Sequence, residues 1–572
     1  MASTTASTTI EAAPTVTMGD APVQSSLKPK LHGRAFYESI GSPKYIIAPM
    51  VDASEFAWRM LARTFMPESE RKSILAYTPM MHARLFAESQ KYRDTHFQPL
   101  RPDPSSTTTP PAEIPWLDGN PAIDRPLFVQ FCANDPEHLL AAAKLAAPHC
   151  DAVDLNLGCP QGIARKGHYG AFLQEDQELI HNLIKTLHEN LPVPVTAKIR
   201  ILETREATLA YAKNVLSAGA SILTVHGRRR EQKGHLTGIA DWEYIRYLRD
   251  NLPKETVIFA NGNILRHEDI EKCLAATGAD GVMSAEGHLS DPAIFSKPPA
   301  IGEEGREYWR GRDGRGGWRV DAVCRRYFDI LHKYALGVEP PVRRPLFMPG
   351  DDTAWLEEPK TEEAGDGPPK KKRKQEGRKV IIESPNLCVV QTHLFHLLRH
   401  FVSRHHDVRD ALAKARVGDM VQYEVLLEMI ERKVAQGLLE YEKTDGASFE
   451  LTGISITPED EDYYDPESSE TAVKVCKRPW WCVQPIIRPV PKEAMAKGAI
   501  QPKREKGQPR NKQKNGTQTQ PNATTAELTE NGNGNGDVAR LQGEQASADG
   551  HIESVASLKR KSEYQESELI SG

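Results

Sequence analysis

The sequence has few cysteines, no long apolar run and no large excess of charge of one sign. Eight cysteines are scattered at irregular spacings over 572 residues. That density is too low for the disulfide framework of a small secreted domain, so we expect a reducing environment. No apolar run approaches the roughly 20 residues that span a bilayer, and we expect no membrane partner. The formal net charge of -5 does not by itself indicate a nucleic-acid partner.

The N-terminal region also lacks the features of a targeting sequence. Its first 24 residues have no apolar core and no early basic residue, which argues against a secretory signal. They contain two acids and no arginine, unlike a mitochondrial presequence. We therefore expect residues 1–40 to be a disordered tail. The low-complexity residues 492–572 are expected to form a second disordered tail.

Short apolar, β-rich segments alternate with helical patterns between about residues 44 and 295. Continuous apolar strands separated by helices indicate a parallel sheet buried on both faces. Eight such units in about 250 residues match the size of a (β/α)8 barrel. A doubly wound open sheet is the alternative, but unusual polar residues follow nearly every strand. We predict an α/β fold with a TIM barrel over residues 41–310. The expected strands begin at Tyr45, Ile74, Pro126, Ala152, Val195, Ser221, Thr256 and Asp280.

Helical patterns replace the strand pattern beyond residue 294. An amphipathic helix is expected from Val320, and apolar helical periodicity returns after residue 387. We predict a smaller all-α domain over residues 318–445, interrupted by a disordered basic insert at about 338–380. A C-terminal extension follows over residues 446–491. The Pro/Ser/Thr-rich stretch from Arg101 is expected to be a surface loop.

Polar residues lie at the ends of the expected strands, where TIM barrels carry their active sites. Lys198 lies in a strand that should be buried, so a functional ammonium group is favoured over a surface charge. It would neutralise a reduced flavin. Gln130 can hydrogen-bond a flavin edge or be a satisfied core amide. Gly262 lets backbone N–H groups approach a phosphate, where His226 and Arg228 can add charge, although Asn-Gly is also a common turn.

Cys159 is the strongest single candidate for chemistry. It lies in a Gly-Cys-Pro turn after the fourth strand, followed by the basic, glycine-rich segment QGIARKGHYGAFL. A thiol near cationic groups suits proton donation or nucleophilic attack, and a buried structural cysteine is the alternative. Cys476 and Cys482 have no second cysteine pair nearby, so we expect structural thiols there and no metal site.

These segments resemble the tRNA-dihydrouridine synthase family, and within it the eukaryotic branch that acts on uridines 16 and 17 of the D-loop. The resemblance covers about residues 44–295 and is weaker in the helices that follow. Its most specific part is LNLGCP with the RKGHYGAFL that comes after it. The matching strings are APMVDAS, LNLGCPQGIARKGHYGAFL, TAKIRI, TVHGRRREQKG, ANGNI and DGVMSAEGHLSDPAIF.

The resemblance implies FMN as cofactor, NADPH or NADH as reductant, and reduction of the C5–C6 bond of uridine to 5,6-dihydrouridine in tRNA. It implies that Cys159 is the proton donor and that Asn156 faces the uracil. Bacterial members carry Gly-Arg where this chain has Ala285-Glu286, and a glutamate cannot bind phosphate as arginine does. We expect these two residues to contribute only their backbone. The implied cofactor contacts are Pro49, Met50, Val51, Gln130, Lys198, His226, Asn261, Gly262, Asn263, Ala285 and Glu286.

Basic residues on the rim and in the helical domain are expected to bind tRNA. For each of them a solvated surface charge is an equal alternative. The segment PPKKKRK from Pro368 resembles a nuclear import signal, with an RNA-binding patch as the alternative. We therefore expect an import receptor as a partner and a location in nucleus and cytoplasm. We also expect the protein to be a monomer. The rim residues expected to contact substrate are Arg165, Lys166, Arg228 and Arg230.

Two other interpretations remain open at this stage. One is an FMN barrel that reduces a free pyrimidine, against which the basic rim and the helical extension argue. The other is a non-catalytic RNA-binding barrel, against which the presence of both Cys159 and Lys198 argues.

Overall fold

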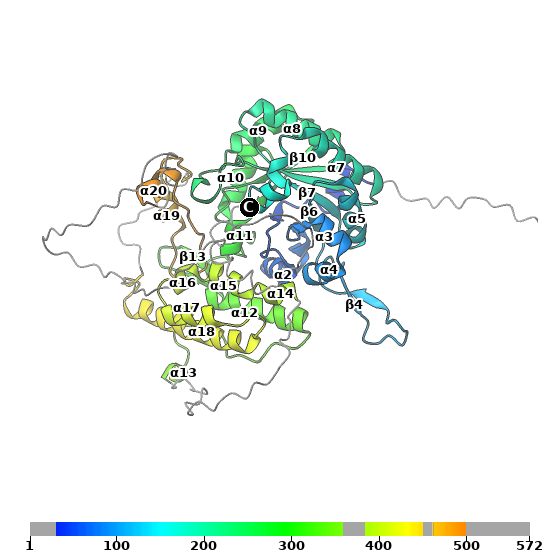
Figure 1. Ribbon diagram of the computed structural model, residues 1–572. Coiled ribbons are helices and arrows are strands. Elements are labelled where there is room, and N and C mark those ends of the chain that lie inside the picture. The colour runs from blue at the N-terminus through cyan, green and yellow to red at the C-terminus, as the bar shows by residue number, and fades with distance from the viewer. Residues whose placement is uncertain (1–29, 358–383, 450–459, 461–462, 499–572) are drawn as a thin grey trace, which may run out of the picture.

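A computed structural model describes residues 30–357, 384–449, 460 and 463–498 (Figure 1). Its centre is a closed barrel of eight parallel strands, in which each strand pairs with the next in chain order and the first pairs with the last. The predicted (β/α)8 barrel and its eight strands are confirmed. The strands are β1 (Tyr45–Ile47), β2 (Ile74–Tyr77), β6 (Leu127–Cys132), β7 (Ala152–Leu157), β8 (Val195–Arg200), β9 (Ile222–His226), β10 (Val257–Asn261) and β11 (Gly281–Ser284).

The barrel forms because its strands are apolar on both faces. Every position of β6, β7 and β8 is buried, with side chains alternating between the barrel interior and the surrounding helices. Four of those helices begin at a side-chain cap: Asp135, Asp176, Thr204 and Asp241 each accept a hydrogen bond from a backbone N–H of the first turn. The surrounding helices include α5 (Pro136–Ala146), α7 (Gln177–Asn190), α8 (Arg205–Ser217), α9 (Trp242–Asn251) and α10 (Glu268–Thr277).

Shorter elements complete the loops around the barrel. β3 pairs with the end of β6 and extends the sheet locally. The short elements in these loops are α2 (Phe56–Thr64), η1 (Glu68–Ser73), β3 (Met81–His82), α3 (Ala83–Glu88), α4 (Gln90–His96), η2 (Ala147–His149), α6 (Gly162–Gly167), η3 (Gly170–Leu173), η4 (Gly234–Leu236) and α11 (Glu286–Ser290).

A short helix, α1 (Gly33–Ser39), closes the amino-terminal end of the barrel. Phe36 stacks on Phe128 with ring centroids 5.9 Å apart, and the Tyr37 hydroxyl donates to the carbonyl of Asp280. The expectation of a disordered tail up to residue 40 is therefore wrong from residue 30 onward, because these aromatic side chains are buried. Residues 1–29 lie outside the described residues.

Two β-hairpins occur where no strand was expected. β4 (Leu100–Pro102) and β5 (Glu113–Pro115) pair in the predicted surface loop and project from the barrel (Figure 1). β12 (Tyr308–Arg310) and β13 (Gly316–Trp318) pair around the glycine-rich turn after the barrel. Strands of three residues are too short to show an alternating pattern in the sequence.

The helices after the barrel pack directly on it. α12 contacts both α2 of the barrel and the long helix α18. Trp58 on α2 stacks against His393 on α15 at 3.9 Å between ring centroids, and the His393 ring nitrogen Nε2 lies 2.9 Å from Glu55. The helical region and the barrel therefore share one apolar core. The helices of the helical region are α12 (Val320–Ile330), the π-helical turn η5 (Leu331–Leu336), α13 (Ala354–Glu357), α14 (Pro385–Cys388), α15 (Val390–Leu397), α16 (Arg399–Val402), α17 (His406–Lys414) and α18 (Met420–Lys443).

The C-terminal extension, residues 463–498, runs between the helical region and the mouth of the barrel. Trp481 is fully buried beside the helices, while Tyr463 and Tyr464 contact the loop after β10. The extension contains α19 (Glu470–Cys476) and α20 (Pro491–Ala496), and the second lies in a range expected to be disordered. The PPKKKRK segment and residues 499–572 lie outside the described residues. Among the helices described, none is long and apolar enough to cross a membrane.

Candidate active site

The polar residues predicted at the strand ends meet at the carboxyl end of the barrel. Asn156 at the end of β7 is the register partner of Lys198 in β8. His226 at the end of β9 is the register partner of Asn261 at the end of β10. These residues come from separate parts of the sequence, and the barrel brings them to one face. Cys159 follows Asn156 in the next loop.

A chain of hydrogen bonds links the barrel interior to Cys159. The Gln130 amide donates from Nε2 to Asp154 at 2.8 Å, and its Oε1 accepts from Asn156 Nδ2 at 2.8 Å. Asn156 Oδ1 in turn accepts from the backbone N–H of Cys159 at 2.9 Å. Because an ionised carboxylate can only accept, Asp154 orients both amides and so fixes the loop that carries the thiol. Gln130 is thus bonded at both ends within the barrel, which is the arrangement of a satisfied core amide.

The Cys159 loop is also held by two cations. Arg200 donates from Nε to the carbonyl of Gly158 at 2.7 Å, and Lys233 donates from Nζ to the carbonyl of Pro160 at 2.8 Å. Burial raises the pKa of the Cys159 thiol above its ordinary value, although nearby positive charges, including those of Arg200 and Lys198, oppose the shift. The group is therefore a protonated thiol near neutral pH, which suits a proton donor better than a nucleophile.

Lys198 lies in the same space as Cys159. Its side chain is buried, and Nζ forms no hydrogen bond or ion pair with the residues that the structure describes. Burial and the neighbouring charge of Arg200 lower the Lys198 pKa to about 7, while Asp154 and Cys159 oppose that shift. An anionic ligand at this position would restore the ammonium form, since an opposite charge favours it. The sequence-predicted residues Cys159 and Lys198 thus lie at one end of the barrel, joined through Asn156, which accepts from the Cys159 N–H and is the register partner of Lys198.

Lys198 should make the stability of the ligand-free protein depend on pH. Its folded-state pKa of about 7 lies below the unfolded value of about 10.4. Between these values the unfolded chain binds more protons, so the free energy of unfolding rises with pH. We expect Lys198→Met to raise the free energy of unfolding most at pH 7 and below, and progressively less as the pH approaches 10. Urea unfolding at several pH values measures this difference. Lys185→Met, at an exposed site on α7, is the control and should show no such trend. If the difference in the free energy of unfolding between Lys198→Met and the wild type did not change with pH, the lowered pKa of Lys198 would be contradicted.

His226 offers a hydrogen-bond donor instead of the positive charge expected from the sequence. Burial lowers its pKa well below the ordinary value, and the charges of Arg200, Lys198 and Arg228 lower it further. Its Nε2 lies 3.1 Å from Arg228 Nη1. A guanidinium can only donate, so Nε2 accepts and the ring proton is on Nδ1. That buried Nδ1 has no partner among the described residues.

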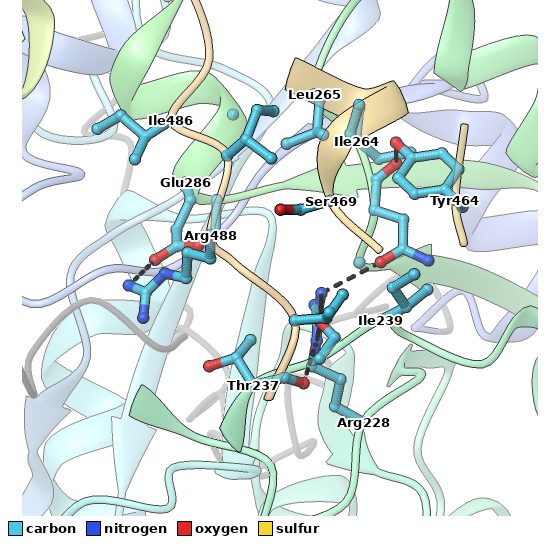
Figure 2. Close-up of a pocket in the computed structure, with 18 of the residues that line it drawn as sticks. Arg228, Thr237, Ile239, Ile264, Leu265, Glu286, Tyr464, Ser469, Ile486 and Arg488 are labelled. Atoms are coloured by element: carbon cyan, nitrogen blue, oxygen red, sulfur yellow. Dashed lines mark hydrogen bonds and ion pairs between the residues drawn. The ribbon is translucent and has the colours of Figure 1, made fainter. Parts of the chain in front are cut away.

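Arg228 faces inward instead of standing on the exposed rim. It donates to the carbonyls of Thr237 at 3.2 Å and Gly238 at 3.0 Å, and to Asn263 Oδ1 at 3.1 Å. It lines a cavity of about 110 Å³ between the ends of β9, β10 and β11 and the C-terminal extension (Figure 2). This volume exceeds the ~30 Å³ share of one water molecule and admits a small polyatomic group.

The inner wall of this cavity is suited to a phosphate group. Gly262 has φ 119°, and a Cβ there would lie 2.5 Å from the Cβ of Ala240 and 3.3 Å from Arg228 Nη1, so only glycine fits. Ser284 Oγ and Asn261 Oδ1 are buried without a hydrogen-bond partner among the described residues. His226 Nδ1 and Ser284 Oγ can each donate a hydrogen bond to a phosphate oxygen, whereas Asn261 Oδ1 can only accept.

The remaining predicted residues occupy more varied positions. Arg165 and Lys166 are exposed on α6 beside the Cys159 loop. Arg230 pairs with Glu175 at 2.6 Å and lies over the ring of Phe172, so much of its charge is already compensated. The loop after β1 contains three further predicted cofactor contacts, Pro49, Met50 and Val51. Met50 is buried and Val51 is exposed.

Ala285, directly after β11, is buried. The side chain of Glu286 faces the cavity and pairs with Arg488 of the extension (Figure 2). That these two residues contribute only their backbone to a cofactor site stays a prediction.

Four residues at the site were missed from the sequence. Asp154 and Arg200 stand two positions from Asn156 and Lys198 in the same strands, and this period of two places them on the same face. A charged residue in an otherwise apolar strand was the signal that could have revealed them. Tyr464 and Arg488 belong to the extension, where no local pattern indicates a contact with the barrel.

Comparison with known proteins gives consistent matches. A family model described as dihydrouridine synthase matches residues 46–330. The chain is 43% identical over 466 residues to a Saccharomyces cerevisiae protein named tRNA-dihydrouridine(16/17) synthase, covering 82% of this chain and 88% of that protein. It is 42% identical over 464 residues to a Schizosaccharomyces pombe protein of the same name, covering 81% and 92%. Both alignments extend well beyond the barrel.

Proposed function

The chain belongs to the dihydrouridine synthase family, and on that premise we propose that it reduces uridines 16 and 17 of transfer RNA to 5,6-dihydrouridine. The two fungal relatives whose names state this activity are matched over most of their length. The observation that carries the assignment is the placement of Cys159 and Lys198 at the carboxyl end of the barrel, where the Cys159 N–H donates to Asn156, the register partner of Lys198. NADPH or NADH is the reductant, in keeping with the NAD(P)(+) in those names.

FMN is the bound cofactor in this proposal, and the residues at the site fit it. Lys198 would hold the flavin end, and Arg228, Gly262 and the donors His226 Nδ1 and Ser284 Oγ would hold the phosphate end. When bound, FMN supplies hydride chemistry between the nicotinamide and the uracil ring.

The protein's own residues supply the rest of the reaction. Adding two hydrogens to the C5–C6 bond requires one of them to arrive as a proton. Cys159 holds that proton at Sγ, because burial keeps the thiol protonated, and solvent restores it after transfer to C5. The hydrogen-bond chain from Asp154 through Gln130 and Asn156 holds the Cys159 backbone in position. Lys198 opposes negative charge that develops on the reacting ring.

The tRNA must present an extruded base to this site, since a stacked uridine is out of reach. Arg165 and Lys166 are exposed beside the Cys159 loop and can bind phosphates of the surrounding RNA. The exposed basic residues Arg399 and Arg404 of the helical region can bind further phosphates. The proposal also includes import into the nucleus through PPKKKRK, alongside a cytoplasmic population, and action as a monomer.

The decisive experiment maps dihydrouridine in tRNA from cells that lack this protein. Dihydrouridine should vanish at positions 16 and 17, persist at other positions, and return when the gene is restored. Purified protein with NADPH should reduce folded tRNA and leave free uridine unchanged. Dihydrouridine that persists at positions 16 and 17 would refute the substrate assignment, and turnover of free uridine alone would favour the small-molecule reductase.

A further inference from the structure

The C-terminal extension forms the outer wall of the phosphate-sized cavity. The inner wall consists of the ends of β9, β10 and β11. The outer wall belongs to the extension, which contributes Tyr464, Ser469, Ile486 and Arg488 among others (Figure 2). The barrel alone would leave this side of the cavity open to solvent.

The extension is fixed at this place by contacts at both of its ends. Tyr463 donates from its hydroxyl to Asp269 at 2.6 Å, and the Tyr464 hydroxyl donates to the backbone carbonyl of Asn263. Further along, the backbone N–H of Val483 donates to the carbonyl of Trp318 at 2.9 Å. Tyr463 is buried by these contacts, so the segment is packed into the fold and does not merely lie on its surface.

The charges around the cavity make the contribution of the extension important. The barrel provides one guanidinium, Arg228, and one carboxylate, Glu286, whose charges cancel. Arg488 adds a second guanidinium, which pairs with Glu286 and lies close enough to Arg228 to lower that residue's pKa. Asp465, also from the extension, is exposed, where water and salt screen its charge. Arg488 therefore adds a second guanidinium to the enclosed part of the cavity, next to Arg228.

A phosphate monoester carries a charge of about -1.5 to -2 at neutral pH, which a second guanidinium helps to balance. Arg488 donates to Glu286 and, at 3.4 Å, to the carbonyl of Gly234, and a guanidinium has five N–H donors in a planar fork, so these bonds do not prevent it from also binding phosphate. We propose that Arg488 binds the cofactor phosphate, and that the C-terminal extension thereby completes a cofactor site of which the barrel alone provides only the inner wall. This inference rests on FMN being the cofactor, as in the proposed function.

The test compares FMN with riboflavin, which differs from it only in lacking the phosphate. The full-length protein is freed of flavin and titrated with each compound by fluorescence. Arg488→Met should weaken FMN binding by about 10-fold to 100-fold, the usual effect of losing a charged hydrogen bond, and leave riboflavin binding unchanged. Lys492→Met is the control, because Lys492 is an exposed cation of the same extension, on α20, paired with Glu467. It should retain the full preference for FMN.

A second variant separates phosphate binding from a purely structural pairing. Glu286→Gln removes the carboxylate that competes for Arg488, so FMN affinity should stay equal or increase. If Glu286→Gln loses the FMN preference as Arg488→Met does, the ion pair is structural and the inference is overturned. This variant also decides the matter if Arg488→Met does not fold. Wild-type protein that binds neither flavin would refute the proposed function itself, whereas an Arg488→Met protein that keeps its preference for FMN would refute only this inference.

Discussion

Replacing Cys159 by alanine is expected to slow dihydrouridine formation by about 10²-fold to 10⁴-fold, the usual contribution of a positioned general acid. In the proposed reaction the Cys159 thiol is the proton source, and burial keeps it protonated. Alanine removes the proton and leaves the backbone hydrogen bond to Asn156 intact. The flavin content and the melting temperature should therefore remain close to those of the wild type. Single-turnover reduction of tRNA by the pre-reduced protein measures the effect.

Cys150→Ala provides the matched control for this substitution. Cys150 is also a buried thiol, but it precedes β7 at the opposite end of the barrel. Its removal should leave the rate of tRNA reduction near that of the wild type. If Cys159→Ala retained the wild-type rate, the proton would have to come from another group and the role given to this thiol would be wrong.

Replacing Asp124 by asparagine is expected to lower the free energy of unfolding by about 3–5 kcal/mol. Asp124 is fully buried and pairs with two buried guanidiniums, those of Arg59 and Arg63 on α2. It also accepts the backbone N–H of Gly119 at 2.9 Å. Without the carboxylate, Arg63 loses its ion-pair partner and Arg59 keeps only Asp118. Urea unfolding followed by tryptophan fluorescence measures the loss.

An exposed ion pair serves as the comparison for Asp124. Arg84 and Glu88 lie 3.2 Å apart on α3, with both side chains at least half exposed. Water already solvates these charges, so Glu88→Gln should not change the urea midpoint measurably. Equal effects of the two substitutions would mean that the buried cluster does not stabilise the fold in the way its burial indicates.

The barrel could be predicted because the sequence pattern of each strand is contained in a few consecutive residues. Each strand is a short apolar run bounded by turn residues, and each predicted active-site residue lies within such a run or soon after it, so their meeting at one face needs only the rule for parallel barrels. The helix from Val320 could be predicted for the same reason, from its own apolar periodicity. Hairpins of three-residue strands, such as β4 and β5, carry no comparable pattern.

The arrangement of the site depended on contacts that no local pattern contains. Whether Gln130 would face a ligand or its neighbours was decided by Asp154, which lies on the adjacent strand. The charge of His226 was decided by burial beside three cations. Arg488 reaches the barrel only because Tyr463 and Trp481 anchor the extension at distant points. Such long-range contacts can be read only from the folded chain.

If Arg488 binds the cofactor phosphate as proposed, its position in the chain also sets an order of events during synthesis. The ribosome finishes all eight barrel strands long before it reaches the extension, and domains generally fold as they emerge. A newly made barrel would therefore exist for a time with one wall of its phosphate cavity missing. Cofactor loading would follow the arrival of the final folded segment, so that a prematurely terminated chain would contain every barrel residue of the active site and still retain flavin poorly.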